Sequence, residues 1–166
     1  MLGLTSLGIV HTAISLVAVV AGVIAFFRYK EIVPGTRLGQ VYVWTTVLTC
    51  LTGFGIFQHR GFGKPHALGI LTLIVLAVAA VAGRTQLFGR LSKYVETISY
   101  TTTFFFHMIP GFTESLTRLP AGSPVFSSAE DPGLQPVVGV VFVLFLIGAV
   151  LQVLRLRGAG RAAAVV

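Results

Sequence analysis

Five long apolar segments constrain the fold of this chain more than any other feature. They cover about residues 7–27, 38–57, 66–83, 91–109 and 136–154, separated by stretches rich in Gly, Pro or charge. A helix of about 20 apolar residues is long enough to cross the hydrocarbon core of a bilayer. We therefore predict an all-α, polytopic membrane helical bundle with five transmembrane helices, forming a single transmembrane domain over residues 1–166.

The composition favours a membrane protein over a soluble one. Charged residues make up 10% of the chain, whereas soluble domains carry about a quarter. The net charge of +7 does not indicate nucleic-acid binding, because most basic residues lie at the ends of apolar segments, where they meet lipid headgroups. The predicted partner is the lipid bilayer, and no nucleic-acid partner is expected.

Basic residues predict the orientation of the bundle. If the five helices alternate in direction, nine basic residues lie on the side of the C-terminus and three on the other. The nine are Arg28, Lys30, Arg37, Arg84, Arg90, Lys93, Arg155, Arg157 and Arg161, and the three are Arg60, Lys64 and Arg118. Cytoplasmic loops carry an excess of Lys and Arg. We therefore predict an N-out/C-in protein of a bacterial inner membrane, with residues 110–135 as an outer loop.

All four histidines fall on the outer side in this topology. They are His11, His59, His66 and His107. His11 and His107 lie within predicted membrane helices, about one or two turns below the outer surface. Neutral imidazole binds transition metals and haem iron, and bundle cores are where such sites are built. The four histidines are therefore candidate cofactor ligands, and His11 and His107 are the candidate metal ligands.

The first predicted helix directs its histidine toward the bundle. His11, Ser15, Ala18 and Gly22 follow one another at i, i+4, i+7 and i+11, so they share one face. Small residues on one face allow helices to approach closely in lipid. This face is therefore expected to pack against the other helices, with His11 inside.

Three interpretations of the histidines remain open at this point. Haem b takes two axial histidines from facing helices, which the pairs His11–His107 or His59–His107 would supply. Zinc or copper would take three or four imidazoles. Alternatively, the histidines are interfacial rings and the protein holds no cofactor.

The fourth predicted helix carries a polar stripe. Glu96, Tyr100, Thr103 and His107 recur at i, i+4, i+7 and i+11, which places them on one face. Such a stripe should face protein or water rather than lipid. Glu96, Tyr100 and Thr103 could thus relay protons to His107, and the alternative is a face for helix packing.

The sequence contains no pattern that indicates catalysis. It has no Ser-His-Asp arrangement, no phosphate-binding glycine loop and no paired carboxylates, so an enzyme is not favoured. The preferred function is a small membrane protein whose outer histidines bind haem b or a transition metal for electron transfer to a redox partner. The alternative is a structural or accessory subunit of a larger membrane complex, which packs through the aliphatic, lipid-facing helix 136–154 and the outer loop. A transporter is third, because no inverted repeat is visible.

Two segments resemble a known group of proteins. They are the run from His11 to Gly22 and the sequence Gly35-Thr36-Arg37-Leu38-Gly39-Gln40-Val41-Tyr42. Both resemble small bacterial predicted membrane proteins of unknown function, over the first three helices. Those relatives often carry a Gly-Thr-x-x-His segment, where this chain has Arg37-Leu38 instead. A more distant resemblance links the four helices with inward histidines to cytochrome b membrane proteins. Because all four histidines lie on one side here, that resemblance implies at most one haem, near the outer face.

Overall fold

The fold is a bundle of long α-helices. The computed structural model describes residues 5–56 and 61–163. Within these ranges the regular elements are α-helices and one 3-10 helix, and there is no strand. The elements are α1 (Ser6–Tyr29), α2 (Arg37–Gly53), α3 (Lys64–Arg84), the 3-10 helix η1 (Gly89–Leu91), α4 (Ser92–Arg118) and α5 (Leu134–Ala163). The predicted all-α class is therefore confirmed.

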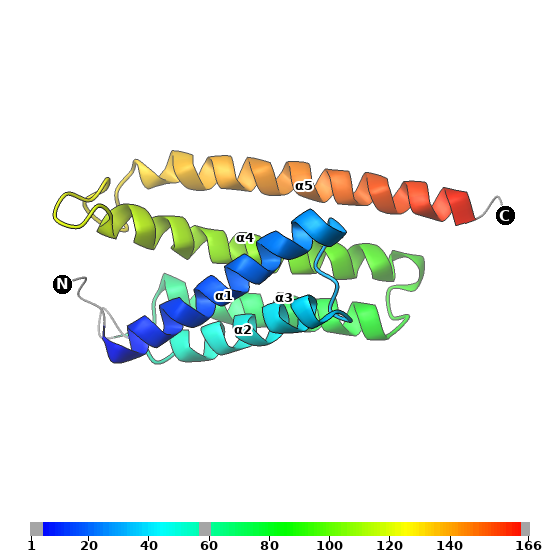
Figure 1. The fold of residues 1–166 in the computed structure, drawn as a ribbon, viewed down its shortest axis with the longest axis horizontal. Helices are drawn as coiled ribbons and strands as arrows, with labels where there is room; N and C mark the ends of the chain where they lie inside the picture. The colour runs from blue at the N-terminus through cyan, green and yellow to red at the C-terminus, as the bar shows by residue number, and fades with distance from the viewer. Residues whose placement is uncertain (1–4, 57–60, 164–166) are drawn as a thin grey trace.

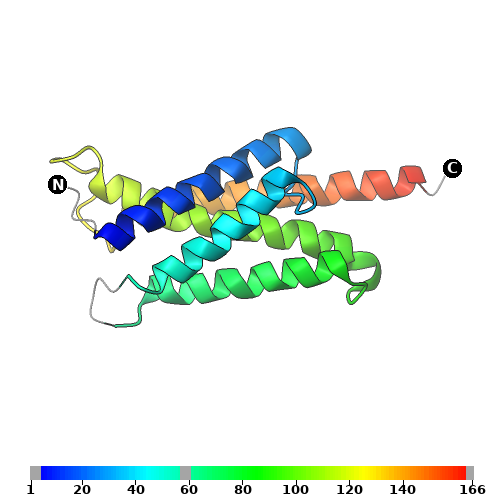
Figure 2. The same ribbon diagram turned by 60° about the horizontal axis from the view of Figure 1, so that its bottom comes forward.

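Successive helices alternate in direction along the bundle. Figure 1 shows α1, α3 and α5 running away from the end that carries the N-terminus, while α2 and α4 run back. We call this end the N-terminal end; it also holds the α2–α3 and α4–α5 connections. The opposite, C-terminal end holds the α1–α2 and α3–α4 connections. Helix α4 contacts α1, α3 and α5, and α2 contacts α1 and α3 (Figures 1 and 2).

The structure supports fewer membrane spans than the sequence predicted. Among the described residues, three helical stretches are long and apolar enough to cross a membrane: Ser6–Tyr29, Lys64–Arg84 and Leu134–Gly160. Helices α2 and α4 do not meet this description. Helix α2 has 17 residues, and both are rich in threonine. By length and composition, the three apolar stretches mark the chain as a membrane protein.

Two helix boundaries also differ from the prediction. Helix α4 was expected to end near residue 109, but it continues through Pro110 to Arg118. Threonine hydroxyls support this last part, because Thr113 and Thr117 donate to carbonyls one turn back, at 2.8 and 2.7 Å. Helix α5 extends past residue 154 to Ala163. The connection between α4 and α5 is consequently shorter than the predicted loop 110–135.

Local sequence accounts for where α1 and α2 begin. The Thr5 hydroxyl accepts from the Gly8 amide at 3.1 Å, and the Thr36 hydroxyl accepts from the Gly39 amide at 3.0 Å. Each threonine thereby satisfies an amide that has no partner within its helix. Helix α1 ends at Tyr29, and the next residue, Lys30, has a left-handed φ of 64° that stops the helix. The chain can then turn back into α2 within a few residues.

Small residues of α1 form the close contacts of the core. Ala18, Ala21 and Ala25 are buried, and a Cβ added to Gly22 would lie 2.7 Å from Cε2 of Phe104. Phe104 meets Phe26 edge to face, with ring centroids 5.0 Å apart. Small residues let helix backbones approach in lipid. This confirms the prediction that the Ala18 and Gly22 face of α1 packs inside the bundle.

Candidate functional site

A chain of buried polar side chains joins α2 to α4. Nε2 of His107 lies 3.1 Å from the Thr46 hydroxyl, and the Tyr42 hydroxyl lies 2.8 Å from that of Thr103. Tyr42 and Thr46 lie about one turn apart on α2. All of these residues are buried, with Thr46, Tyr42 and Thr103 at 0% exposure. Polar groups inside a membrane bundle stabilise it when each finds a partner.

The single proton of a hydroxyl gives the bond between Tyr42 and Thr103 a direction. Thr103 donates to the carbonyl of Tyr100 at 2.8 Å, so its oxygen accepts from the Tyr42 hydroxyl. The bond between Thr46 and His107 can run in either direction, and each direction corresponds to one tautomer of the ring.

His11 binds the same helix one to two turns farther along. Its Nδ1 lies 3.0 Å from the Thr52 hydroxyl. That hydroxyl donates to the carbonyl of Leu48 at 2.8 Å, so its oxygen accepts from His11. The ring lies over Gly53, where an added Cβ would be 3.2 Å from Cε1 of His11. In this tautomer, the lone pair of His11 is on Nε2.

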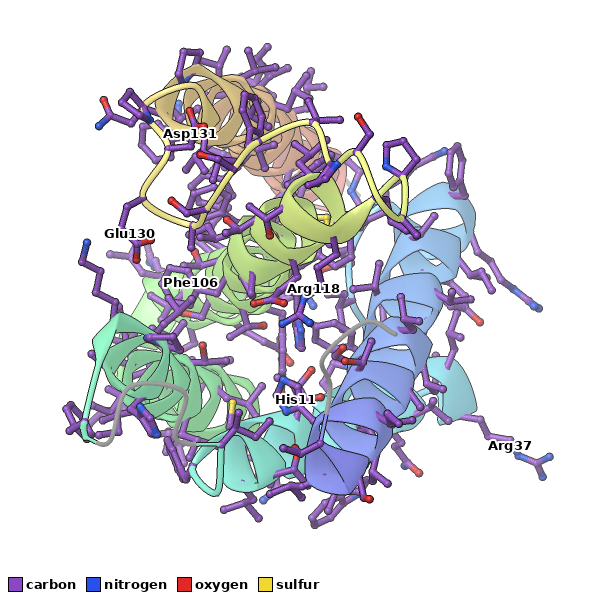
Figure 3. The ribbon with its side chains drawn as sticks, turned by 90° about the vertical axis from the view of Figure 1, so that its left-hand side faces the viewer. His11, Arg37, Phe106, Arg118, Glu130 and Asp131 are labelled. Atoms are coloured by element: carbon purple, nitrogen blue, oxygen red, sulfur yellow. The ribbon has the colours of Figure 1, made fainter. Side chains whose placement is uncertain are left out.

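The two rings bond to α2 at different depths, since Thr46 lies in the middle of α2 and Thr52 lies near its end. Because α4 continues to Arg118, His107 lies eleven residues, about 16 Å, from the end of its helix, deeper than the one or two turns that the sequence predicted. Their threonine partners, Thr46 and Thr52, are six residues apart, which corresponds to about 9 Å along a helix. In Figure 3, His11 and Arg118 lie within the ring of helices, whereas Arg37 points outward.

The other two predicted ligands are placed differently. His66 is buried in the first turn of α3, where its Nδ1 accepts from the Gly63 amide at 3.2 Å, and its ring stacks on Phe62. His66 thus caps its own helix. His59 lies outside the described residues. Across residues 5–56 and 61–163, no three side chains of His, Cys, Asp or Glu come together as a metal-binding group.

The polar stripe predicted on α4 faces the interior. Tyr100, Thr103 and His107 are buried, and Glu96 is partly buried. Glu96 packs closely on Gly83 of α3 and forms an ion pair of 3.2 Å with Lys93. Among these residues, Thr103 and His107 belong to the chain that reaches α2. The other two lie nearer the C-terminal end, so the stripe spans much of the bundle.

Glu31 organises a charged cluster that sequence reasoning missed. It follows α1 and is 7% exposed. Its carboxylate accepts from Thr97 at 2.7 Å and forms ion pairs with Lys93, at 3.2 Å, and with Arg155. Burial by itself would raise the pKa of Glu31, but the Thr97 hydroxyl, Lys93 and Arg155 together hold that pKa below its ordinary value of 4.5. The cluster ties α1, α4 and α5 together at the C-terminal end.

Gln152 anchors the outermost helix to the bundle. Its side-chain carbonyl accepts from Thr101 of α4 at 2.8 Å, and its amide donates to the carbonyl of Lys30 at 2.9 Å. Arg155, one turn on, donates to the carbonyl of Tyr29 at 2.7 Å. The sequence did carry a signal for this contact, since Gln152 is the one amide within a long aliphatic run.

The candidate site thus has two ends: a histidine pair held by threonines of α2, and a carboxylate cluster around Glu31. Thr46 and Tyr42, which connect the pair to α4, were not singled out from the sequence, because a threonine on a membrane helix usually bonds its own backbone. No family model, curated protein or solved structure matches this chain.

Proposed function

We propose that all five helices cross a bacterial inner membrane, with the N-terminus outside and the C-terminus inside. Helices α1, α3 and α5 are the three candidate spans and run in the same direction, so α2 and α4 must return across the bilayer between them. The 17 residues of α2 extend about 26 Å, close to the hydrocarbon thickness of about 30 Å. In the middle of α4, Thr97, Tyr100, Thr101, Thr103 and His107 are buried in the bundle. The excess of basic residues at the C-terminal end supports the orientation.

Reporter fusions test this topology. Alkaline phosphatase fused after residue 166 should be inactive in a bacterial host, because the enzyme folds only outside the cytoplasm, whereas a fluorescent protein fused there should fluoresce. The matched control places alkaline phosphatase after Ser127, in the α4–α5 connection, where it should be active. An active C-terminal fusion with an inactive fusion at Ser127 would reverse the orientation and move the histidines to the inner side.

We propose that the histidine pair binds a transition-metal ion, copper or zinc, and that with copper the protein transfers electrons to a redox partner. The observation that carries this proposal is the arrangement of the two rings. His11 and His107 come from different helices, α1 and α4, and one nitrogen of each ring bonds to a threonine hydroxyl of α2. Metal-binding histidines are held in this way, because the second hydrogen bond fixes the ring and its tautomer. The other ring nitrogens, Nε2 of His11 and Nδ1 of His107, would then be the metal ligands.

Haem b has less support than a metal ion. A porphyrin needs a slot between helices that a histidine faces. The groove of about 570 Å³ beside α4 and α5 has no histidine in its lining. Each of the two rings lies instead against a threonine of α2. A shared metal ion would require the two rings, whose threonine partners are about 9 Å apart along α2, to move toward each other.

Metal binding can be tested directly on the purified protein. Wild type in lipid nanodiscs should bind about one copper or zinc ion per chain. His107→Ala removes a ligand, so its affinity should fall by about 100-fold or more, which exceeds the 10–100-fold typical for losing a supporting group. His66→Ala is the matched control, since His66 caps α3 and should not affect metal affinity. Mass spectrometry measures the metal content of each protein, and calorimetric titration measures its metal affinity.

An accessory role without a cofactor is the second candidate. It is favoured by the fact that each histidine already has a hydrogen-bond partner on α2, which suffices to explain its burial as a contact between helices. The mostly exposed helix α5 would then offer an aliphatic face to a larger membrane complex. A wild-type protein that binds neither copper nor zinc, and shows no visible haem spectrum, would favour this candidate over the first.

A further inference from the structure

A large apolar groove opens between α4, α5 and the end of α1. Its volume is about 570 Å³, and its walls include Phe26, Phe104, Phe105, Leu144 and Phe145. Phe105 and Phe145 stack with ring centroids 5.1 Å apart. Pockets of 300–1,000 Å³ are the usual size for small-molecule sites. The groove is therefore large enough for a ligand, and its walls select an apolar one.

The two uncharged polar residues along the groove, Thr101 and Gln152, do not require a polar ligand. Thr101 donates to Gln152, and the Gln152 amide donates to the carbonyl of Lys30. These groups satisfy one another within the wall. The groove also lies against α5. Only 6% of the residues in the apolar stretch of this helix are buried inside the bundle, so the rest face lipid. In a bilayer, the nearest apolar molecule of suitable shape is a lipid acyl chain.

Two cations stand at one end of the groove. Lys30 and Arg155 are both among its lining residues. The Lys30 ammonium donates to the carbonyl of Phe27 at 3.1 Å, which leaves two of its three N–H groups for other acceptors. Arg155 uses two of its five N–H groups, on Tyr29 and Glu31. The end of the groove therefore offers donors that suit a phosphate, while Arg155 is held in place by its other bonds.

We propose that this groove binds one anionic phospholipid, with an acyl chain between α4 and α5 and the phosphate on Lys30 and Arg155. The dimensions agree with this occupant. The lining of α5 extends from Val141 to Arg155, about 21 Å along a helix. One leaflet of the hydrocarbon core is about 15 Å deep. An acyl chain can thus lie along the groove while its headgroup remains at the membrane surface. Basic pockets between membrane helices bind anionic headgroups in this way.

Filling the groove tests the acyl-chain part of the proposal. Gly148 lines the groove, and a Cβ added there meets nothing within 4 Å, so Gly148→Leu should fold and occupy the space. Gly139→Leu is the matched control, because Gly139 also lies in open space on α5 but does not line the groove. Native mass spectrometry of protein from phosphatidylglycerol nanodiscs should show one retained lipid for wild type and Gly139→Leu. Gly148→Leu should lose it.

Neutralising Lys30 tests the headgroup part. Lys30→Gln should reduce the preference for phosphatidylglycerol over phosphatidylcholine by about fivefold, the effect of one basic residue near a charged headgroup. Arg28→Gln is the control, since Arg28 lies over the Tyr29 ring and does not line the groove. Equal lipid retention by Gly148→Leu and wild type would overturn the proposal. So would a dimer in wild type that Gly148→Leu abolishes, because a second copy of the chain would then fill the groove.

Discussion

Replacing Glu31 by glutamine is expected to lower the free energy of unfolding by about 2–3 kcal/mol. This value lies between the limit of about 1 kcal/mol for an exposed ion pair and the 3–5 kcal/mol for breaking a buried one. Glu31 itself is buried, but the side chains of Arg155 and Lys93 are 40% and 47% exposed. Glutamine can still accept from Thr97, yet it leaves Arg155 without its carboxylate and Lys93 with Glu96 alone. Denaturant titration in detergent micelles measures the change.

Glu114→Gln provides the matched control for this substitution. Glu114 pairs with Arg118 four residues away, at the exposed end of α4. Pairs of this kind contribute about 0.3–0.5 kcal/mol. A loss as large as that of Glu31→Gln would show that the cluster at the C-terminal end has no special role. A negligible loss in Glu31→Gln would show the same.

The same carboxyl predicts a pH dependence. Its pKa in the folded protein is below 4.5, so its contribution to the free energy of unfolding is fully present above pH 4.5. The contribution declines as the pH falls below 4.5 and through the folded-state pKa, because the unfolded chain takes up the proton first. Glu31→Gln should lack this part of the decline, which begins below about pH 4.5. Identical pH profiles for the two proteins would contradict the assignment.

Gly39→Ala is expected to lower the free energy of unfolding by about 3 kcal/mol, the upper part of the range for overpacked sites. A Cβ at residue 39 would overlap the carbonyl of Val33 in the preceding turn and lie 3.0 Å from Cα of Pro34. That carbonyl cannot easily move, because it accepts from the amide and hydroxyl of Thr36 at 3.1 and 2.8 Å. The turn would have to open and α2 would lose its cap.

Gly35→Ala is the control in the same turn. A Cβ there meets nothing within 4 Å. Because alanine restricts the unfolded chain, this substitution should be neutral or stabilise the protein by about 0.4–1 kcal/mol. Thermal unfolding should therefore show a large loss of stability for Gly39→Ala, and no loss or a gain for Gly35→Ala. A similar loss in both would mean that the turn is sensitive to any side chain.

These two glycines explain part of the segment from Gly35 to Tyr42 that resembles other membrane proteins. Thr36 caps α2, Gly39 permits the close turn, and Tyr42 is fully buried in the polar chain to α4. Local chemistry of this kind can be recognised in a sequence, since caps and turns depend on neighbouring residues. The partner of Tyr42, Thr103, is 61 residues away and cannot be recognised from local pattern.

The number and order of the helices could be predicted because apolar length and Gly or Pro breaks are local signals. The end of α4 could not, because Pro110 was taken as a stop, yet the helix continues past it. The inward face of α4 was predicted from its spacing, and the burial of Tyr100, Thr103 and His107 agrees with that prediction. The spacing alone could not reveal that His107 bonds to Thr46.

The Glu31 cluster illustrates a different limit. Lys30 and Glu31 look like an ordinary charged end of a membrane helix. Their importance depends on Arg155, whose position 124 residues later is set by the packing of α5 on α4. Gln152 depends on the same packing. Residues that join distant helices through one or two bonds carry little signal in a single sequence.

Pulsed electron paramagnetic resonance of the copper(II)-loaded protein tests the central proposal most directly. Imidazole ligands are detected through their remote ring nitrogens, so the spectrum counts the histidines on the metal. The proposed site, shared by the two rings beside α2, predicts two coupled imidazoles in wild type and one each in His11→Ala and His107→Ala. A wild-type spectrum without imidazole coupling, or one that neither substitution changes, would contradict the proposal.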